Sequence, residues 1–156
     1  MSPLLLLDNN VLSHLVPPEI EESHPLISAV LSLMDDPRFT PCVPEIIDYE
    51  VRRKLLHIGH RRHQGRKWAR EALANLDRMS SVYYLPLTTK TMRLAAELWA
   101  ESRSQGQSRV TEDGLDIDVV LAAQARQVGG WVVTFNEKHF RGLVEVFDWR
   151  PYLTMN

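Results

Sequence analysis

A chain of 156 residues is long enough to bury a hydrophobic core of ordinary size without disulfides or a structural metal. With 44% hydrophobic and 24% charged residues, its composition excludes an intrinsically disordered protein. The formal net charge of −2 is unevenly distributed, because residues 51–70 hold eight of the eighteen Lys and Arg residues and none of the twenty Asp and Glu residues. The rest of the chain carries ten basic and twenty acidic residues, a net charge of about −10.

The single cysteine and the lack of long apolar segments indicate in which cellular compartment the protein is expected. Cys42 has no partner for a disulfide within the chain, as expected in a reducing cytoplasm, and its apolar neighbours favour a buried structural thiol over a nucleophile. The apolar run Leu4–Leu7 is too short for a signal peptide and lacks a basic start. No stretch is long enough to span a bilayer. We therefore expect a cytoplasmic protein without a membrane anchor.

Apolar runs alternate with helical patterns along the chain, which predicts an α/β fold with a parallel sheet. The predicted strands are Pro3–Leu7, Phe39–Val43, Val82–Leu87, Trp131–Phe135 and Val144–Phe147. The predicted helices are Asn10–Leu15, His24–Met34, Pro44–Ile58, Gln64–Met79, Thr88–Ser104 and Asp116–Val128. The first and fourth strands are continuously apolar, as is typical of central strands that are covered on both faces.

Prolines and glycines punctuate these elements. Pro44 suits the first turn of its helix, and the pair Gly129-Gly130 ends the last long helix. The polar segment Gly106–Gly114 predicts a loop, for which an ordinary connection is favoured over a substrate clamp. There are no repeats and no sign of a second domain, so residues 1–156 are expected to form a single domain.

Two polar residues directly follow the two central strands. Asp8 follows the first strand and Asn136 follows the fourth, and ligands of open parallel sheets bind outside the carboxyl ends of the strands. Asn10 and Ser13 lie within about a turn and a half of Asp8 and could donate hydrogen bonds to a carboxylate or a phosphate. Helix capping by Asn9 or Asn10 is the alternative for these amides.

Glu50 lies on the apolar half of its predicted helix, at about 100° per residue, so a solvated position does not explain it. Lys54, four residues later on the same half, offers an ion pair as the structural alternative to a ligand role. Asp48 lies about 160° around the helix from Glu50 and is expected to face solvent.

Asp118 borders the apolar face of the helix Asp116–Val128, where Ala122 and Ala125 leave room for a carboxylate to project toward the sheet. Asp116 lies about 160° away, at the expected start of the helix. A capping role and a catalytic role are both open for Asp116.

Converging carboxylates from Asp8, Glu50 and Asp118 would suit a hard divalent cation such as Mg²⁺ or Mn²⁺. In phosphodiester cleavage such an ion makes a water nucleophilic and neutralises the charge that builds at phosphorus. The sequence contains no zinc-spaced Cys or His pairs, no Gly-rich phosphate loop and no nucleophile elbow. These features favour metal-dependent hydrolysis.

The basic block of residues 51–70 is compatible with binding to RNA, with an acidic protein partner or with a solvated helix pair. The candidate RNA-binding residues are Arg52, Arg53, Arg61 and Arg62. Three histidines recur at every third position of the block, where we expect them at the surface or facing RNA rather than on a metal: His57, His60 and His63.

At these residues the chain resembles the PIN-domain family and, within it, the VapC-type ribonuclease toxins of bacterial toxin–antitoxin pairs. The resemblance covers almost the whole chain, and it is the order and spacing of its fragments that make it specific. The matching fragments are Leu6–Ser13, Glu50–Leu56, Asp116–Ala123 and Val132–Phe140.

The resemblance implies a PIN-like three-layer fold, with a sheet of about five parallel strands flanked by helices, and Mg²⁺- or Mn²⁺-dependent endonucleolytic cleavage of RNA. Asp8, Glu50 and Asp118 match the acidic motif positions, and Asp116 matches an additional acid of some members. Asn136 stands where many relatives carry a fourth acid, which puts a second metal site in doubt and suits Asn136 to orienting water or phosphate. A homodimer and inhibition by a cognate antitoxin are also implied.

Two further hypotheses stand beside an endoribonuclease toxin. A catalytically weak PIN-like module that binds RNA or protein would explain the missing fourth acid, and its binding would survive chelation. A phosphohydrolase of the haloacid dehalogenase type also places an Asp after its first strand, but it needs a second Asp two residues later, where this chain has Asn10.

Overall fold

The computed structural model describes residues 2–61, 65–105 and 112–154. Strands and helices alternate along the chain, so the predicted α/β class is confirmed. The elements are β1 (Leu4–Leu7), α1 (Asn9–Leu15), α2 (Pro25–Met34), β2 (Thr40–Pro44), α3 (Glu45–Arg61), α4 (Gly65–Val82), β3 (Tyr84–Leu85), α5 (Thr89–Ser104), α6 (Glu112–Val128), β4 (Trp131–Val133) and the short 3₁₀ helices η1 (Glu137–His139) and η2 (Arg150–Thr154).

The strands form a parallel four-stranded sheet in the order β3-β2-β1-β4. About five strands were expected, and the segment predicted as the fifth makes one isolated parallel bridge between Val146 and Val132. Two backbone hydrogen bonds flank that bridge, from Val132 N to Glu145 O at 3.2 Å and from Phe147 N to Val132 O at 2.8 Å. In the described part of the chain this segment therefore pairs beside β4 without extending into a strand.

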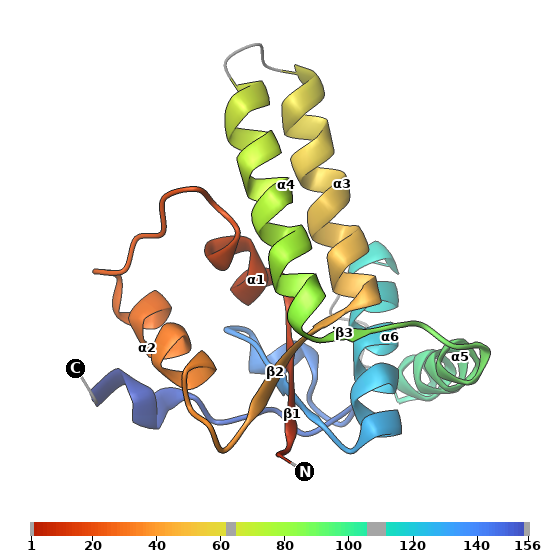
Figure 1. Cartoon of the computed structure of the whole chain (residues 1–156). Coiled ribbons are helices and arrows are strands. Elements are labelled where there is room, and N and C mark those ends of the chain that lie inside the picture. The colour runs from red at the N-terminus through yellow and green to blue at the C-terminus, as the bar shows by residue number, and fades with distance from the viewer. Residues whose placement is uncertain (1, 62–64, 106–111, 155–156) are drawn as a thin grey trace.

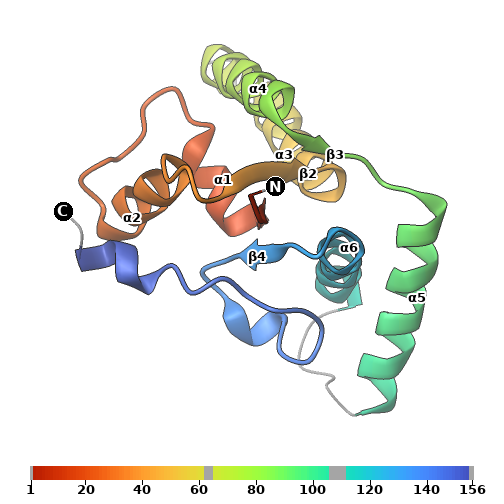
Figure 2. The ribbon, with the colours of Figure 1, turned by 60° about the horizontal axis from the view of Figure 1, so that its bottom comes forward.

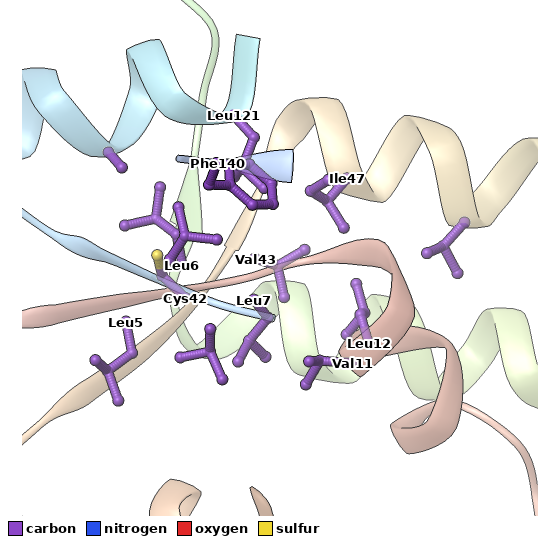
Figure 3. Close-up of a cluster of buried hydrophobic side chains, with 14 of the residues drawn as sticks. Leu5, Leu6, Leu7, Val11, Leu12, Cys42, Val43, Ile47, Leu121 and Phe140 are labelled. Atoms are coloured by element: carbon purple, nitrogen blue, oxygen red, sulfur yellow. The ribbon is translucent and has the colours of Figure 1, made fainter. Parts of the chain in front are cut away.

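The central strand β1 is buried on both faces, as its continuous apolar sequence predicts. Leu5, Leu6 and Leu7 are all at most 1% exposed. Figure 3 shows Leu6 on the same side as Leu121 and Phe140, while Leu5 and Leu7 point to the opposite side. Side chains of a strand alternate between its faces, so covering both faces requires apolar residues at every position.

Helices cover both sides of the sheet (Figure 2). Helices α1 and α2 lie on one side, and α6 lies on the other with α5 packed outside it. Helices α3 and α4 pack side by side as an antiparallel hairpin that projects well beyond the sheet (Figure 1). The described residues of the basic block, 51–61 and 65–70, therefore lie on this projecting hairpin. No helix among the described residues is long and apolar enough to cross a membrane.

Several boundaries differ from the prediction. Pro44 is the last residue of β2, and α3 begins at Glu45. Helix α6 begins at Glu112, four residues earlier than predicted, so the capping role considered for Asp116 is wrong. Residues 106–111 of the predicted loop lie outside the described residues. Gly129 ends α6 as predicted, with a φ of 62° that favours glycine.

Candidate metal-dependent active site

The switch point of the sheet lies between β1 and β4. From β1 the chain continues to β2 on one side, and the strand on the other side of β1 is β4. Asp8 follows β1 and Thr134 follows β4, and the adjacent parallel register brings both to the same edge. This edge is where open α/β sheets bind their ligands.

A hollow of about 300 Å³ opens at this edge. Three carboxylates from distant parts of the chain line it, those of Asp8, Glu50 and Asp118, and these residues are only 7%, 7% and 8% exposed. Asp116 is exposed and is not among the residues that line the hollow. The full lining is Asp8, Asn9, Asn10, Glu50, Arg53, Ile117, Asp118, Asn136 and His139.

Asp8 is held by neutral hydrogen-bond donors. It caps α1, accepting a hydrogen bond from the backbone N–H of Asn9 at 2.6 Å, and its Oδ2 accepts one from the Thr134 hydroxyl at 2.7 Å. Burial raises the pKa of Asp8, against the lowering effect of these two hydrogen bonds and of the nearby His139 and Lys54.

The amides near Asp8 have different roles from those considered above. Asn10 bridges to the end of β4, donating to Thr134 Oγ1 at 3.1 Å and accepting from the backbone N–H of Phe135 at 3.2 Å. Ser13 donates to Asn9 Oδ1 at 2.8 Å at an exposed position and does not line the hollow. Since Asp8 itself caps α1, the capping role considered for Asn9 or Asn10 is wrong.

Glu50 is paired with two cations of its own helix. Lys54 Nζ lies 2.8 Å from Oε1, and the Arg53 guanidinium contacts Oε2. The contact with Arg53 lacks hydrogen-bond geometry, so Oε2 is a buried oxygen without a hydrogen-bond partner in the described structure. The ion pair with Lys54 that the helical spacing allowed is therefore present.

Asp118 is buried without a full set of polar partners. Burial, together with the neighbouring Asp8 carboxylate, raises the pKa of Asp118 to about 7. Its buried Oδ2 has no hydrogen-bond partner among the described residues, and His139 Nδ1 lies 3.3 Å from it. A carboxylate left in this state is suited to a positive ligand.

His139 is a site residue that the sequence did not single out. It follows Asn136 by one turn of η1, and the Asn136 amide Nδ2 lies 2.8 Å from His139 Nε2. Residues one turn apart lie on the same side of a 3₁₀ helix. The spacing of His139 three residues after Asn136 is therefore the sequence signal that could have placed it in the site.

Asp48 was expected to face solvent, and that prediction is wrong, because the residue is only 8% exposed. Arg52 pairs with Asp48 at 2.9 Å and with Asp77 at 2.8 Å, which joins α3 to α4. The helical wheel of α3 could not show that α4 packs over this side. Arg52 is therefore engaged within the hairpin.

The other basic candidates lie at different distances from the site. Arg53 lines the hollow, whereas Arg61 is exposed at the end of α3. His57 and His60 are exposed on α3, as expected. Arg62 and His63 lie outside the described residues.

The PIN-domain family model matches residues 5–144, which is most of the chain. The chain belongs to the PIN-domain family. No curated protein is significantly similar to it in sequence. PIN domains are generally nucleases and typically bind a divalent metal ion.

Solved structures agree with this fold over nearly their full length. FitAcB from Neisseria gonorrhoeae is 21% identical with a TM-score of 0.71, covering 94% of this chain and 98% of that one. VapBC2 from Rickettsia felis, bound to a DNA fragment from its promoter, is 16% identical with a TM-score of 0.67, covering 94% and 98%. DNA-bound VapBC from Salmonella typhimurium is 19% identical with a TM-score of 0.66, covering 96% and 99%.

The donor chemistry of this PIN domain fits a hard divalent cation, because three carboxylates line one hollow and two of their buried oxygens lack hydrogen bonds. The three carboxylates do not, however, form a complete metal site. Among the described residues no three His, Cys, Asp or Glu side chains stand close enough together to hold a metal ion. Glu50 is paired instead with Arg53 and Lys54.

Proposed function

We propose that this PIN domain is a metal-dependent endoribonuclease that hydrolyses RNA phosphodiester bonds and acts as the toxin of a toxin–antitoxin pair. The observation that carries the proposal is the convergence of Asp8, Glu50 and Asp118 on one hollow at the switch point of the sheet. Membership of a family whose members are generally nucleases supports the same reaction.

In this proposal Asp8, Glu50 and Asp118 hold Mg²⁺ or Mn²⁺. When bound, the ion supplies a positive charge that activates water and offsets the charge developing on the phosphate. Thr134 fixes the orientation of the Asp8 carboxylate through its 2.7 Å hydrogen bond. Asn136 and His139, which line the same hollow, present polar groups that can orient water or a phosphate oxygen.

RNA reaches the hollow along the α3–α4 hairpin. Arg53 lies in the hollow and Arg61 at the far end of the same helix, so cations extend from the site toward the tip of the hairpin. The phosphate backbone is attracted to such a series of cations irrespective of base sequence. Arg61 would contribute steering, whereas Arg52 is held by Asp48 and Asp77. Arg62, which lies outside the described residues, stays a candidate from the sequence alone.

The partners proposed are RNA, a protein antitoxin and a second copy of the chain. The similar VapBC structures bound to DNA support a toxin–antitoxin setting. A homodimer is supported by large apolar side chains left exposed around β3 and α5, of which Val82 is 82% exposed. These side chains are Val82, Tyr83, Tyr84, Met92 and Trp99. A single domain over residues 1–156 and a cytoplasmic location belong to the same proposal.

The test is cleavage of a panel of structured and single-stranded RNAs by the purified protein with Mn²⁺, Mg²⁺ or EDTA. We expect cutting with either metal, none in EDTA, and loss of cutting in Asp8→Asn with the circular dichroism spectrum unchanged. Metal-dependent cutting that persists in Asp8→Asn would contradict the proposed site.

The alternative is a catalytically weak RNA- or protein-binding module. Two observations favour it: Glu50 is paired with Arg53 and Lys54, and Asn136 lines the hollow where a fourth acid would be expected. This alternative predicts RNA retention on a filter that is unchanged by EDTA, with no cleavage in any metal by protein shown to be folded and free of antitoxin.

A further inference from the structure

The Glu50 carboxylate is neutralised by cations one turn further along its own helix. Arg53 contacts Oε2, and Lys54 Nζ lies 2.8 Å from Oε1, so each carboxylate oxygen has a cation beside it. Asp8, by contrast, accepts hydrogen bonds from the uncharged Thr134 hydroxyl and Asn9 N–H. Of these two candidate ligands, Glu50 is the one that forms direct ion pairs with Lys and Arg side chains.

These two cations are partly exposed to solvent, whereas Glu50 is buried. Arg53 also lies over the Tyr49 ring, with its Cζ 5.3 Å from the ring centroid. The side chains of Arg53 and Lys54 are 51% and 53% exposed, and that of Glu50 is 9% exposed. A buried carboxylate stripped of its partners is costly, so the cations leave only when another positive charge replaces them. A divalent ion carries the charge of the two side chains together.

We propose that Arg53 and Lys54 act as an internal counter-charge that prevents Glu50 from binding divalent ions. When an ion binds Glu50, the two side chains are released and bind RNA phosphates instead. The proposal rests on the proposed function and adds a regulation of the same site. Three carboxylates line one hollow, yet no three described His, Cys, Asp or Glu side chains are close enough together to hold a metal ion. The counter-charge accounts for both observations.

The chemistry of the two side chains suits this transfer. An Arg guanidinium presents a planar set of donors that matches phosphate as well as carboxylate, and Lys supplies a compact charge. Arg53 already lines the hollow, within which the substrate phosphate would lie. Metal binding and RNA binding are then coupled, and the coupling free energy is the same whichever ligand binds first.

The first experiment measures Mn²⁺ binding without RNA, by isothermal titration calorimetry on the full chain. Arg53→Met and Lys54→Met each lower the Mn²⁺ dissociation constant about threefold, and the double variant about tenfold, because partly exposed ion pairs of this kind are worth roughly this much. The matched control is Arg52→Met, which removes the same charge from the neighbouring position but pairs with Asp48 and Asp77. We expect Arg52→Met to change the Mn²⁺ dissociation constant less than Arg53→Met or Lys54→Met does.

Asp8→Asn separates this proposal from the proposed function. If wild-type binding is lost in Asp8→Asn but the double variant binds Mn²⁺ no more tightly than Arg52→Met, the metal site stands and the counter-charge proposal is overturned. Absence of Mn²⁺ binding in both the wild type and the double variant overturns both. Binding that appears only in the double variant supports the counter-charge proposal directly.

The second experiment measures RNA binding in EDTA, where metal-dependent cleavage is switched off. Glu50→Gln releases Arg53 and Lys54, so affinity for a single-stranded RNA rises about fivefold at low salt. In the Arg53→Met/Lys54→Met background the same Glu50→Gln change removes the same negative charge but releases no cation, and the gain disappears. An equal gain in both backgrounds would mean that net charge alone is responsible, which overturns the transfer to phosphate.

Discussion

The Thr134 hydroxyl donates a hydrogen bond of 2.7 Å to Asp8 Oδ2, joining the ends of β4 and β1 across 126 positions of the sequence. Thr134 is fully buried, and the same hydroxyl oxygen accepts hydrogen bonds from the Asn10 amide at 3.1 Å and from the Asn136 N–H at 3.0 Å. A single side chain therefore orients three polar residues that line the hollow.

Replacing Thr134 by Val keeps the shape of the side chain and removes the hydroxyl. Because Asp8 and Asn10 then lose a buried partner, we expect the free energy of unfolding to fall by about 1–3 kcal/mol, measured by urea denaturation. Thr134→Ser, which keeps the hydroxyl, should retain more of the stability and of the cleavage activity. Equal losses in the two variants would point to the methyl group instead.

The two acids at the start of α6 should behave differently. Asp118 lines the hollow and is buried, whereas Asp116 is exposed outside it. We expect Asp118→Asn to lower the rate of RNA cleavage by about a hundredfold or more, as for loss of a metal ligand, and Asp116→Asn to change it by less than about threefold. A large loss in Asp116→Asn at unchanged Mn²⁺ affinity would instead give Asp116 a direct role in the reaction.

The stability of the metal-free protein should depend on pH through Asp118. Its pKa is about 7 in the folded protein against an ordinary 3.8, because burial and the Asp8 charge oppose ionisation. The folded state therefore holds this proton more tightly than the unfolded state. The contribution of Asp118 to stability is complete below about pH 4 and is lost as the pH rises toward about 7.

Thermal unfolding in EDTA at about pH 5.5 and pH 8 measures this dependence. We expect a lower Tm at the higher pH and a smaller difference in Asp118→Asn. Mn²⁺ should raise the Tm more at the higher pH, because metal ligands bind in their ionised form. A pH difference that Asp118→Asn leaves unchanged would assign the dependence to another group.

Gly130 lies where a side chain does not fit. A Cβ added there would approach Leu6 Cδ1 to 2.7 Å and the Leu4 carbonyl oxygen to 2.9 Å. We expect Gly130→Ala to lower the free energy of unfolding by about 1–3 kcal/mol, since the backbone of β1 would have to shift. The control is Gly59→Ala within α3, where the added Cβ meets only Ala69 at 3.4 Å and should stabilise the helix by about 0.5–1 kcal/mol. Denaturation of the two variants side by side gives the contrast.

The sequence alone determined the alternation of elements and the place of Asp8. Continuous apolar runs require strands covered on both faces, so the four-residue run before Asp8 had to become a central strand with Asp8 at its carboxyl end. The apolar period of α3 likewise placed Glu50 on a buried side. These results follow from local spacing, which a sequence displays directly.

The tertiary structure decided which neighbours these residues meet. Asp48 is buried because α4 packs over α3 and brings Asp77 to Arg52, a contact that no property of α3 alone encodes. His139 reaches Asp118 because η1 follows β4 at the same edge of the sheet. Helical spacing placed Lys54 beside Glu50, but only packing determined that Arg53 and Lys54 are half-exposed beside it. Periodicity assigns a residue to a face, whereas the contents of a site depend on which distant segments pack against that face.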